Sequence, residues 1–311
     1  MIKFLAILLC AAFLSLVPAR AEESAKPVVV ATLFPVIDFA RTIAGDFADV
    51  RPLLPPGAEA HTYSPTPTDM MSLTQARLFL YVSDSMETWA PGLAAGAPPS
   101  LLVRAVAPAS EACHEDEDEE LHHDEDGESH HHHGLDPHVW LDPLQAQAMV
   151  RAIADALSEA DPEHAIVFSV NAQALQNRLQ ELDTEISTAL ATCKTRTLIC
   201  GGHFAFGHFA ARYGLQHLSP YSGFSPNAQP SPRAIAELVQ NMRNWGTTAI
   251  FYEEILDPKL SRVLADEVGA RLLPLHSMHN ITPEDISSGA TYFSLMHLNL
   301  DNIRQGLGCA P

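Results

Sequence analysis

Four histidines stand where folding would bring side chains from distant segments together. His61 lies in the loop after a predicted strand, and His138 stands just before a long helical region. His203 and His276 each follow a predicted strand directly. Neutral imidazole is a good ligand for zinc, and three or four imidazoles form a familiar tetrahedral shell. The chain has 16 histidines, so spacing alone is a weak signal, but the shared position at strand ends or lobe junctions favours a Zn²⁺ site.

A second metal feature is the segment 113–134, CHEDEDEELHHDEDGESHHHHG, with ten carboxylates and seven histidines. Its only large apolar residue is Leu121, so it cannot bury enough surface to offset the entropy of ordering, and we expect a disordered loop. Mixed imidazole and carboxylate ligands on such a loop would bind zinc weakly. A solvated acidic tract without a metal role is the alternative. The loop histidines are His114, His122, His123, His130, His131, His132 and His133.

The elements that position these residues alternate between apolar strands and helical segments, which is typical of βαβ units with parallel sheets. The predicted strands are 28–34, 50–54, 78–82, 101–106, 197–200, 249–252 and 271–275. The sequence therefore predicts an α/β fold of two lobes, each with a parallel sheet flanked by helices. We expect an amino-terminal lobe at 22–142, a long linking helix at 143–192 and a carboxy-terminal lobe at 193–311. Asp161-Pro162 interrupts the linking helix, so it is either kinked or divided into two parts. Ligands from both lobes would place the metal in the cleft between them, at the carboxyl ends of the strands.

The amino terminus has the features of a secretory signal peptide at 1–21. Lys3 precedes an apolar stretch at 4–17, and Ala19-Arg20-Ala21 supplies a cleavage site after Ala21. A retained anchor helix is the alternative. The formal charge of −20 repels nucleic acid and attracts cations, so nucleic-acid binding is set aside.

Four cysteines would remain after cleavage, namely Cys113, Cys193, Cys200 and Cys309. An exported protein meets oxidising conditions, so a disulfide is expected. Four cysteines allow three full pairings. We favour Cys193 with Cys309, because both fall at the edges of the second half of the chain.

Three stretches in order resemble a known family: PPGAEAHTYSPTPTDM at 55–70, DPHVWLDP at 136–143 and GGHFAFGHFAARYGL at 201–215. They are similar to the signatures of metal-binding proteins of ABC importers, in the ZnuA-type zinc branch with a rigid linking helix. The resemblance covers essentially the whole chain after the signal peptide. It implies a monomeric periplasmic protein that captures Zn²⁺ and delivers it to the membrane permease of an ABC importer. It also implies His61, His138 and His203 as ligands, and the histidine at 203 favours zinc because manganese-binding relatives place a carboxylate there.

The chain departs from the family after its last strand. Relatives commonly have an Asp there, in a stretch like LDPL, whereas this chain has Leu275-His276-Ser277-Met278. His276 as the fourth ligand is our prediction. Water, Glu253, Glu254 and His279 are the alternatives, with His279 placed behind His276.

The sequence leaves three alternatives to zinc capture. A secreted zinc hydrolase would use a three-histidine zinc with an open position, but the sequence has no HExxH and no convincing general base. A carrier of manganese or iron with the same fold would be better served by a carboxylate-rich shell. An adhesin or a soluble metal buffer without a transporter is a further alternative. We therefore expect a binding protein for Zn²⁺ and no enzyme.

Overall fold

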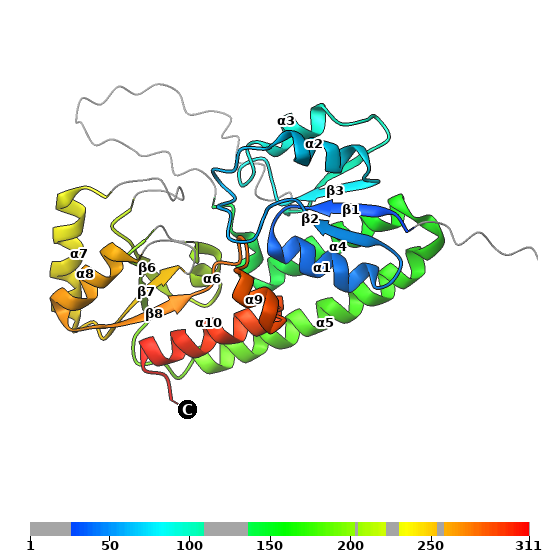
Figure 1. Cartoon of the computed structure of the whole chain (residues 1–311). Coiled ribbons are helices and arrows are strands. Elements are labelled where there is room, and N and C mark those ends of the chain that lie inside the picture. The colour runs from blue at the N-terminus through cyan, green and yellow to red at the C-terminus, as the bar shows by residue number, and fades with distance from the viewer. Residues whose placement is uncertain (1–25, 109–135, 203–204, 222–229, 254–257, 311) are drawn as a thin grey trace, which may run out of the picture.

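The computed structural model describes residues 26–108, 136–202, 205–221, 230–253 and 258–310. The amino-terminal lobe contains a four-stranded parallel sheet in the order β2-β1-β3-β4 (Figure 1). Its strands are β1 (Val28–Ala31), β2 (Asp49–Pro52), β3 (Leu78–Tyr81) and β4 (Leu102–Ala105). Its helices are α1 (Phe34–Ala44), α2 (Pro67–Thr74) and α3 (Ala90–Ala95). The apolar runs in β1 and β3 are almost entirely buried, as expected for inner strands of a parallel sheet.

The carboxy-terminal lobe is built from two parallel strand pairs, β5-β6 and β7-β8. A single parallel bridge between Cys200 and Phe251 brings the two pairs together. The strands are β5 (Thr197–Ile199), β6 (Gln216–Leu218), β7 (Ala249–Glu253) and β8 (Arg271–Leu275). The helices are α6 (Gly207–Arg212), α7 (Pro232–Trp245), α8 (Lys259–Val268), α9 (Pro283–Ser288) and α10 (Tyr292–Leu307). The predicted class, α/β with parallel sheets flanked by helices, is confirmed.

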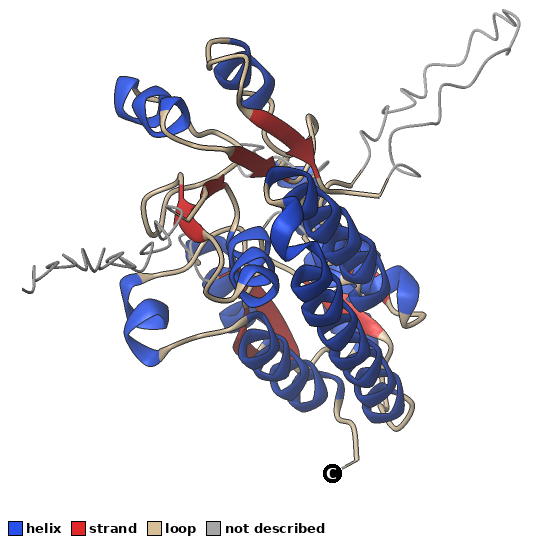
Figure 2. Ribbon diagram, turned by 90° about the vertical axis from the view of Figure 1, so that its right-hand side faces the viewer, coloured by secondary structure: helices blue, strands red, loops and turns tan. Residues whose placement is uncertain are grey.

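The connection between the lobes takes the two-part form of the two alternatives, kinked or two-part, expected at 143–192. It forms two helices, α4 (Pro143–Ala160) and α5 (Ala165–Leu190), separated by a 3-10 turn at Pro162–His164. The chain reverses at this turn, so the two helices lie side by side and α5 alone runs on to the second lobe (Figures 1 and 2). Pro162 has no backbone N–H to continue α4, and the ring of His164 pairs with the Asp161 carboxylate at 2.6 Å.

One face of α5 carries the core that supports the linkage. Leu175, Leu179, Leu182 and Ile186 recur every three or four residues and are buried. The far end of α5 leads to Cys193, which forms a disulfide with Cys309 after α10. The structure therefore contains the Cys193–Cys309 pair that the sequence favoured. Cys200 is buried and outside any disulfide.

Two predicted segments lie outside the described residues. They are the signal peptide at 1–21 and the acidic, histidine-rich segment at 113–134, which includes Cys113. Within the described ranges, none of the helices combines the length and the apolar character that crossing a bilayer requires.

Candidate metal centre

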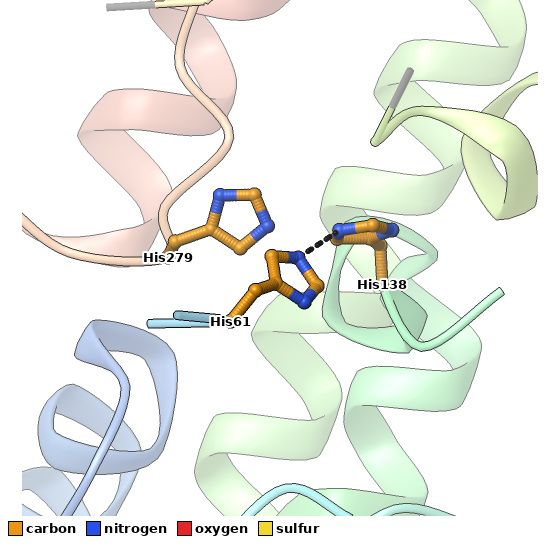
Figure 3. Close-up of side chains that lie close together, drawn as sticks. All are labelled: His61, His138 and His279. Carbon is orange, nitrogen blue, oxygen red and sulfur yellow. Dashed lines mark hydrogen bonds between the residues drawn. The ribbon is translucent and has the colours of Figure 1, made fainter. Parts of the chain in front are cut away.

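Three histidines from separate segments face one another between the lobes: His61, His138 and His279 (Figure 3). Each offers a ring nitrogen, and these three atoms all lie within 4.8 Å of one another. His138 and His279 are buried, whereas His61 is partly exposed. Among the described residues, this is the group of three that could hold a metal ion.

His61 is held by the long loop that joins β2 to α2. The indole N–H of Trp89 donates to the carbonyl of Ala60 at 2.9 Å, and the backbone N–H of His61 donates to the Glu59 carboxylate at 2.9 Å. Further along the loop, the Tyr63 hydroxyl donates to Asp69 at 2.8 Å. These bonds fix the backbone on both sides of the imidazole, so the loop presents His61 without burying it.

His138 is oriented by Asp136, two residues earlier. Oδ1 of Asp136 accepts from the backbone N–H of His138 at 3.1 Å and lies 2.6 Å from its Nδ1. A proton on Nδ1 leaves the lone pair on Nε2, which points toward His61. Gly207 makes room for this carboxylate, because a Cβ at that position would lie 2.2 Å from Asp136 Oδ2. The ring of His208 donates from Nε2 to the Asp136 carbonyl at 2.8 Å and holds the segment from the carboxy-terminal lobe.

His279 comes from the loop after β8. Its Nδ1 lies 2.8 Å from the Ser277 hydroxyl and 3.9 Å from the carboxylate of Glu253 at the end of β7. Trp140 lies against this loop and donates its indole N–H to the Ser277 carbonyl at 2.8 Å. The fully buried Trp140 ring also makes edge contacts with His138 and His279. This indole is therefore an apolar wall shared by two of the three histidines.

Direct hydrogen bonds join the loops that carry His61 and His279. Nδ2 of Asn280 donates to the carbonyls of Pro55 and Ala58 at 2.7 and 3.0 Å. The backbone N–H of Gly57 donates to the carbonyl of Ile281 at 3.0 Å. The two lobes thus meet through the same segments that supply the imidazoles.

The spacing between the ring nitrogens of His61 and His138 suits two ligands of a small tetrahedral ion. Nε2 of His61 and Nε2 of His138 lie 3.2 Å apart. Zinc bound by nitrogens at its usual bond length, with tetrahedral angles, would separate two ligand atoms by about 3.3 Å. Two lone pairs facing each other at this distance repel unless a proton or a cation lies between them. Three convergent imidazoles favour a borderline ion such as Zn²⁺ over Mn²⁺, which prefers oxygen.

Two carboxylates stand behind the imidazoles, one buried at Glu253 and one partly buried at Asp136. Asp136 lies behind His138, and Glu253 lies behind His279. Burial raises the pKa of Asp136 above its ordinary value, and the neighbouring His208 opposes that rise. Such outer carboxylates orient a ligand histidine and increase its basicity.

Of the four predicted ligands, the structure brings His61 and His138 together. His203 lies outside the described residues. His276 is not in the group of three. Its Nδ1 accepts from the Met278 N–H at 3.1 Å, and its Nε2 lies 3.4 Å from Asp285. Burial lowers the pKa of His276, and Asp285 acts in the opposite direction.

Among the described residues, His279 joins His61 and His138, whereas the sequence analysis ranks His279 below His276. Both residues lie in the loop after β8. Asp136 and Asn280 were not singled out from the sequence. The one available signal was that Asp136 falls inside the DPHVWLDP stretch.

The comparisons with known proteins agree on one family. The family model of the periplasmic zinc-uptake complex component A, ZnuA, matches residues 29–306. The high-affinity zinc uptake system protein ZnuA of Bacillus subtilis is 35% identical over 279 residues, covering 90% of this chain and 87% of that protein. The zinc-binding protein AdcA of Streptococcus pyogenes is 33% identical over 290 residues, covering 90% of this chain and 56% of that protein. The chain thus spans a little over half the length of this AdcA.

Solved structures agree in fold over nearly the whole chain. The Zn(II)-bound ZnuA-like domain of Streptococcus pneumoniae AdcA superposes with a TM-score of 0.73 at 30% identity, covering 91% of this chain and 99% of that one. The laminin-binding protein of Streptococcus agalactiae, described as a bifunctional protein with adhesin and metal transporting activity, gives a TM-score of 0.75 at 26% identity. That match covers 91% of this chain and 99% of the other.

Proposed function

The chain belongs to the ZnuA family of periplasmic zinc-uptake components, and we propose that it captures Zn²⁺ outside the cytoplasm and hands it to the permease of an ABC importer. The observation that carries this proposal is the convergence of His61, His138 and His279 between the lobes. The family is a group of transport binding proteins and is not a known class of enzyme. Capture is therefore treated as binding without chemical turnover.

In this proposal the three imidazoles replace water molecules of the hydrated ion. Zn²⁺ approaches from the side of His61, the most exposed of the three, and then meets the buried rings of His138 and His279. Each imidazole must be neutral to bind, so zinc affinity falls as the pH drops. His203 is proposed as a further ligand on the sequence resemblance alone, because the structure does not describe this residue.

Export and delivery complete the proposal. Relatives include a periplasmic component and a zinc-binding lipoprotein, which agrees with export of this chain. We place the mature protein in the periplasm after cleavage following Ala21. The segment 113–134 would gather zinc weakly near the centre, so its deletion should leave the affinity of the tight site nearly unchanged.

A competitive metal titration tests the function. Metal-free protein is titrated with Zn²⁺ and, separately, with Mn²⁺ against a chelator of known affinity. The proposal expects one tight zinc site per chain, and manganese bound more weakly by at least about a hundredfold, as the nitrogen donor set requires. A preference for manganese, or no tight site, would overturn it. For delivery, a deletion strain should grow poorly at limiting zinc and recover when zinc is added.

A further inference from the structure

The loop after β8 makes a tight turn that is closed by a side chain of its own. Nδ1 of His276 accepts a hydrogen bond from the backbone N–H of Met278, two residues later, at 3.1 Å. Asn299 on α10 holds the base of the turn from both sides. Its side-chain oxygen accepts from the His276 N–H at 2.6 Å, and its amide donates to the His276 carbonyl at 2.9 Å. Residues 276–279 are all buried.

Met278 adopts a backbone conformation that explains why the turn needs this support. Its φ is 62°, and among the described residues it is the only non-glycine residue with a positive φ. A left-handed conformation is sterically unfavourable for an L-residue with a side chain, so it persists only where its surroundings impose it. Because this reversal immediately precedes His279, it sets the direction in which the His279 imidazole points.

The bond from Met278 to His276 has the geometry of an Asx turn. In such a turn, the Oδ1 atom of Asn or Asp accepts the N–H of the second residue along the chain. Nδ1 of histidine is bonded to Cγ, as Oδ1 of asparagine is, so the imidazole places an acceptor at the same point. An accepting Nδ1 carries no proton, which puts the proton of the neutral ring on Nε2. That nitrogen lies 3.4 Å from Oδ2 of Asp285, within the capping box of α9.

We propose that His276 is a positioning residue and not a metal ligand: its Nδ1 stabilises the left-handed turn at Met278 and thereby aims His279 at the zinc centre. This inference rests on the proposed function, and it identifies which histidine of the loop binds the ion. Both ring nitrogens of His276 already have partners, so ligation through Nε2 would require breaking the contact with Asp285.

Two substitutions separate the positioning role from a ligand role. Asn at position 276 keeps the turn-closing acceptor but is a poor zinc ligand, whereas Ala removes both properties. We expect His276→Asn to bind zinc within about threefold of the wild type, and His276→Ala to lose about tenfold or more, the effect of removing a supporting hydrogen bond near the metal. The matched control is His297→Asn, a histidine on α10 that pairs with Glu185 at the surface.

Amide hydrogen exchange supplies a readout that does not depend on zinc. The N–H of Met278 should stay protected in metal-free His276→Asn and exchange faster in metal-free His276→Ala. If folded His276→Asn loses as much zinc affinity as His276→Ala, His276 is a ligand and the inference is overturned. Wild-type zinc affinity in His276→Ala would also overturn the inference, because the turn would then not need His276. If the wild type binds no zinc tightly, the proposed function fails, while the exchange of Met278 still tests the turn.

Discussion

Nδ1 of His138 lies 2.6 Å from Oδ1 of Asp136, and this contact leaves Nε2 of the same ring facing Nε2 of His61. The carboxylate therefore selects the tautomer in which a lone pair points toward the proposed zinc position. A second histidine–aspartate pair has the same Nδ1-to-carboxylate distance in different surroundings. His164 and Asp161 are also 2.6 Å apart, but they lie at the reversal between α4 and α5.

Replacing Asp136 should weaken zinc binding without unfolding the protein. In Asp136→Asn the side chain can still accept from His138, but the negative charge behind the ligand is lost. Zinc affinity should fall by about 10- to 100-fold, the range found for outer-shell partners of ligand histidines. Competition against a chelator measures the loss. Asp161→Asn removes the equivalent charge beside His164 and should bind zinc as the wild type does; equal losses in both variants would refute a specific role for Asp136.

Asn280 should control how firmly the two ligand-bearing loops are held together. In Asn280→Asp a carboxylate oxygen replaces the donor and faces the carbonyls of Pro55 and Ala58, so attraction becomes repulsion. Loss of two buried hydrogen bonds is worth about 1–3 kcal/mol, and we expect zinc to dissociate about ten times faster or more. Stopped-flow release into excess chelator measures the rate. Asn302→Asp is the control, because Asn302 donates to the Pro274 carbonyl at 3.0 Å, outside the ligand loops. An unchanged rate in Asn280→Asp would contradict the prediction.

The disulfide should stabilise the fold and leave metal binding alone. Cys193 and Cys309 are 116 residues apart in the sequence, and neither belongs to a segment that carries a proposed ligand. A double substitution to serine should lower the free energy of unfolding by about 2–5 kcal/mol, chiefly because the unfolded chain gains conformational entropy without the cross-link. Denaturant unfolding measures this change. Zinc affinity should stay within about threefold of the wild type, because the hydrogen bonds around the centre do not involve the disulfide. A tenfold loss of affinity would show that it shapes the site.

Glu87 should make the stability of the metal-free protein depend on pH. The side chain is fully buried and accepts from Thr32, Val82 and Ser83. Burial raises its pKa from 4.5 to about 7, against the opposing effect of these hydrogen bonds. Between these two values the folded state binds a proton that the unfolded state does not. The contribution of protonated Glu87 to the stability of the folded state is therefore complete below about pH 4.5 and is lost as the pH rises through about 7.

Glu87→Gln removes this titration and supplies the comparison. Unfolding free energies of the metal-free wild type and variant are measured by denaturant from pH 4.5 to pH 7.5. Relative to the variant, the wild type should lose about 3 kcal/mol over this range. Contributions from other titrating groups cancel in the difference. If the unfolding free energies of the two proteins changed with pH in the same way, Glu87 would not change its protonation state in this pH range.

The sequence predicted the architecture because burial leaves a strong pattern. The apolar runs around Val28–Ala31 and Leu78–Tyr81 are strands with both faces covered. His61 lies in the loop after β2, and His138 lies just before α4, which are the places that the sequence indicated. The break at Pro162 was also visible. Its consequence was not, because a kink and a full reversal differ only in how α4 and α5 pack against their neighbours.

The choice between His276 and His279 shows where the pattern stops being informative. Both are histidines in one loop, and strand-end position favoured the first. The deciding features are the left-handed backbone of Met278 and the bond that closes the turn. Neither has a sequence signal, since methionine ordinarily avoids a positive φ. Asn280 was missed for a similar reason, because its partners Pro55 and Ala58 lie more than two hundred residues away.

The central claim is that His61, His138 and His279 hold zinc together, and His279 is the member on which the sequence and the structure differ. The most direct measurement is the zinc affinity of metal-free wild type, His279→Ala and His297→Ala, each by chelator competition. We predict one tight site in the wild type and in His297→Ala. In His279→Ala zinc affinity should fall by at least about a hundredfold, because a direct ligand should matter at least as much as the outer-shell partners whose loss costs about 10- to 100-fold. Wild-type affinity in His279→Ala would contradict the account and return the third imidazole to another histidine.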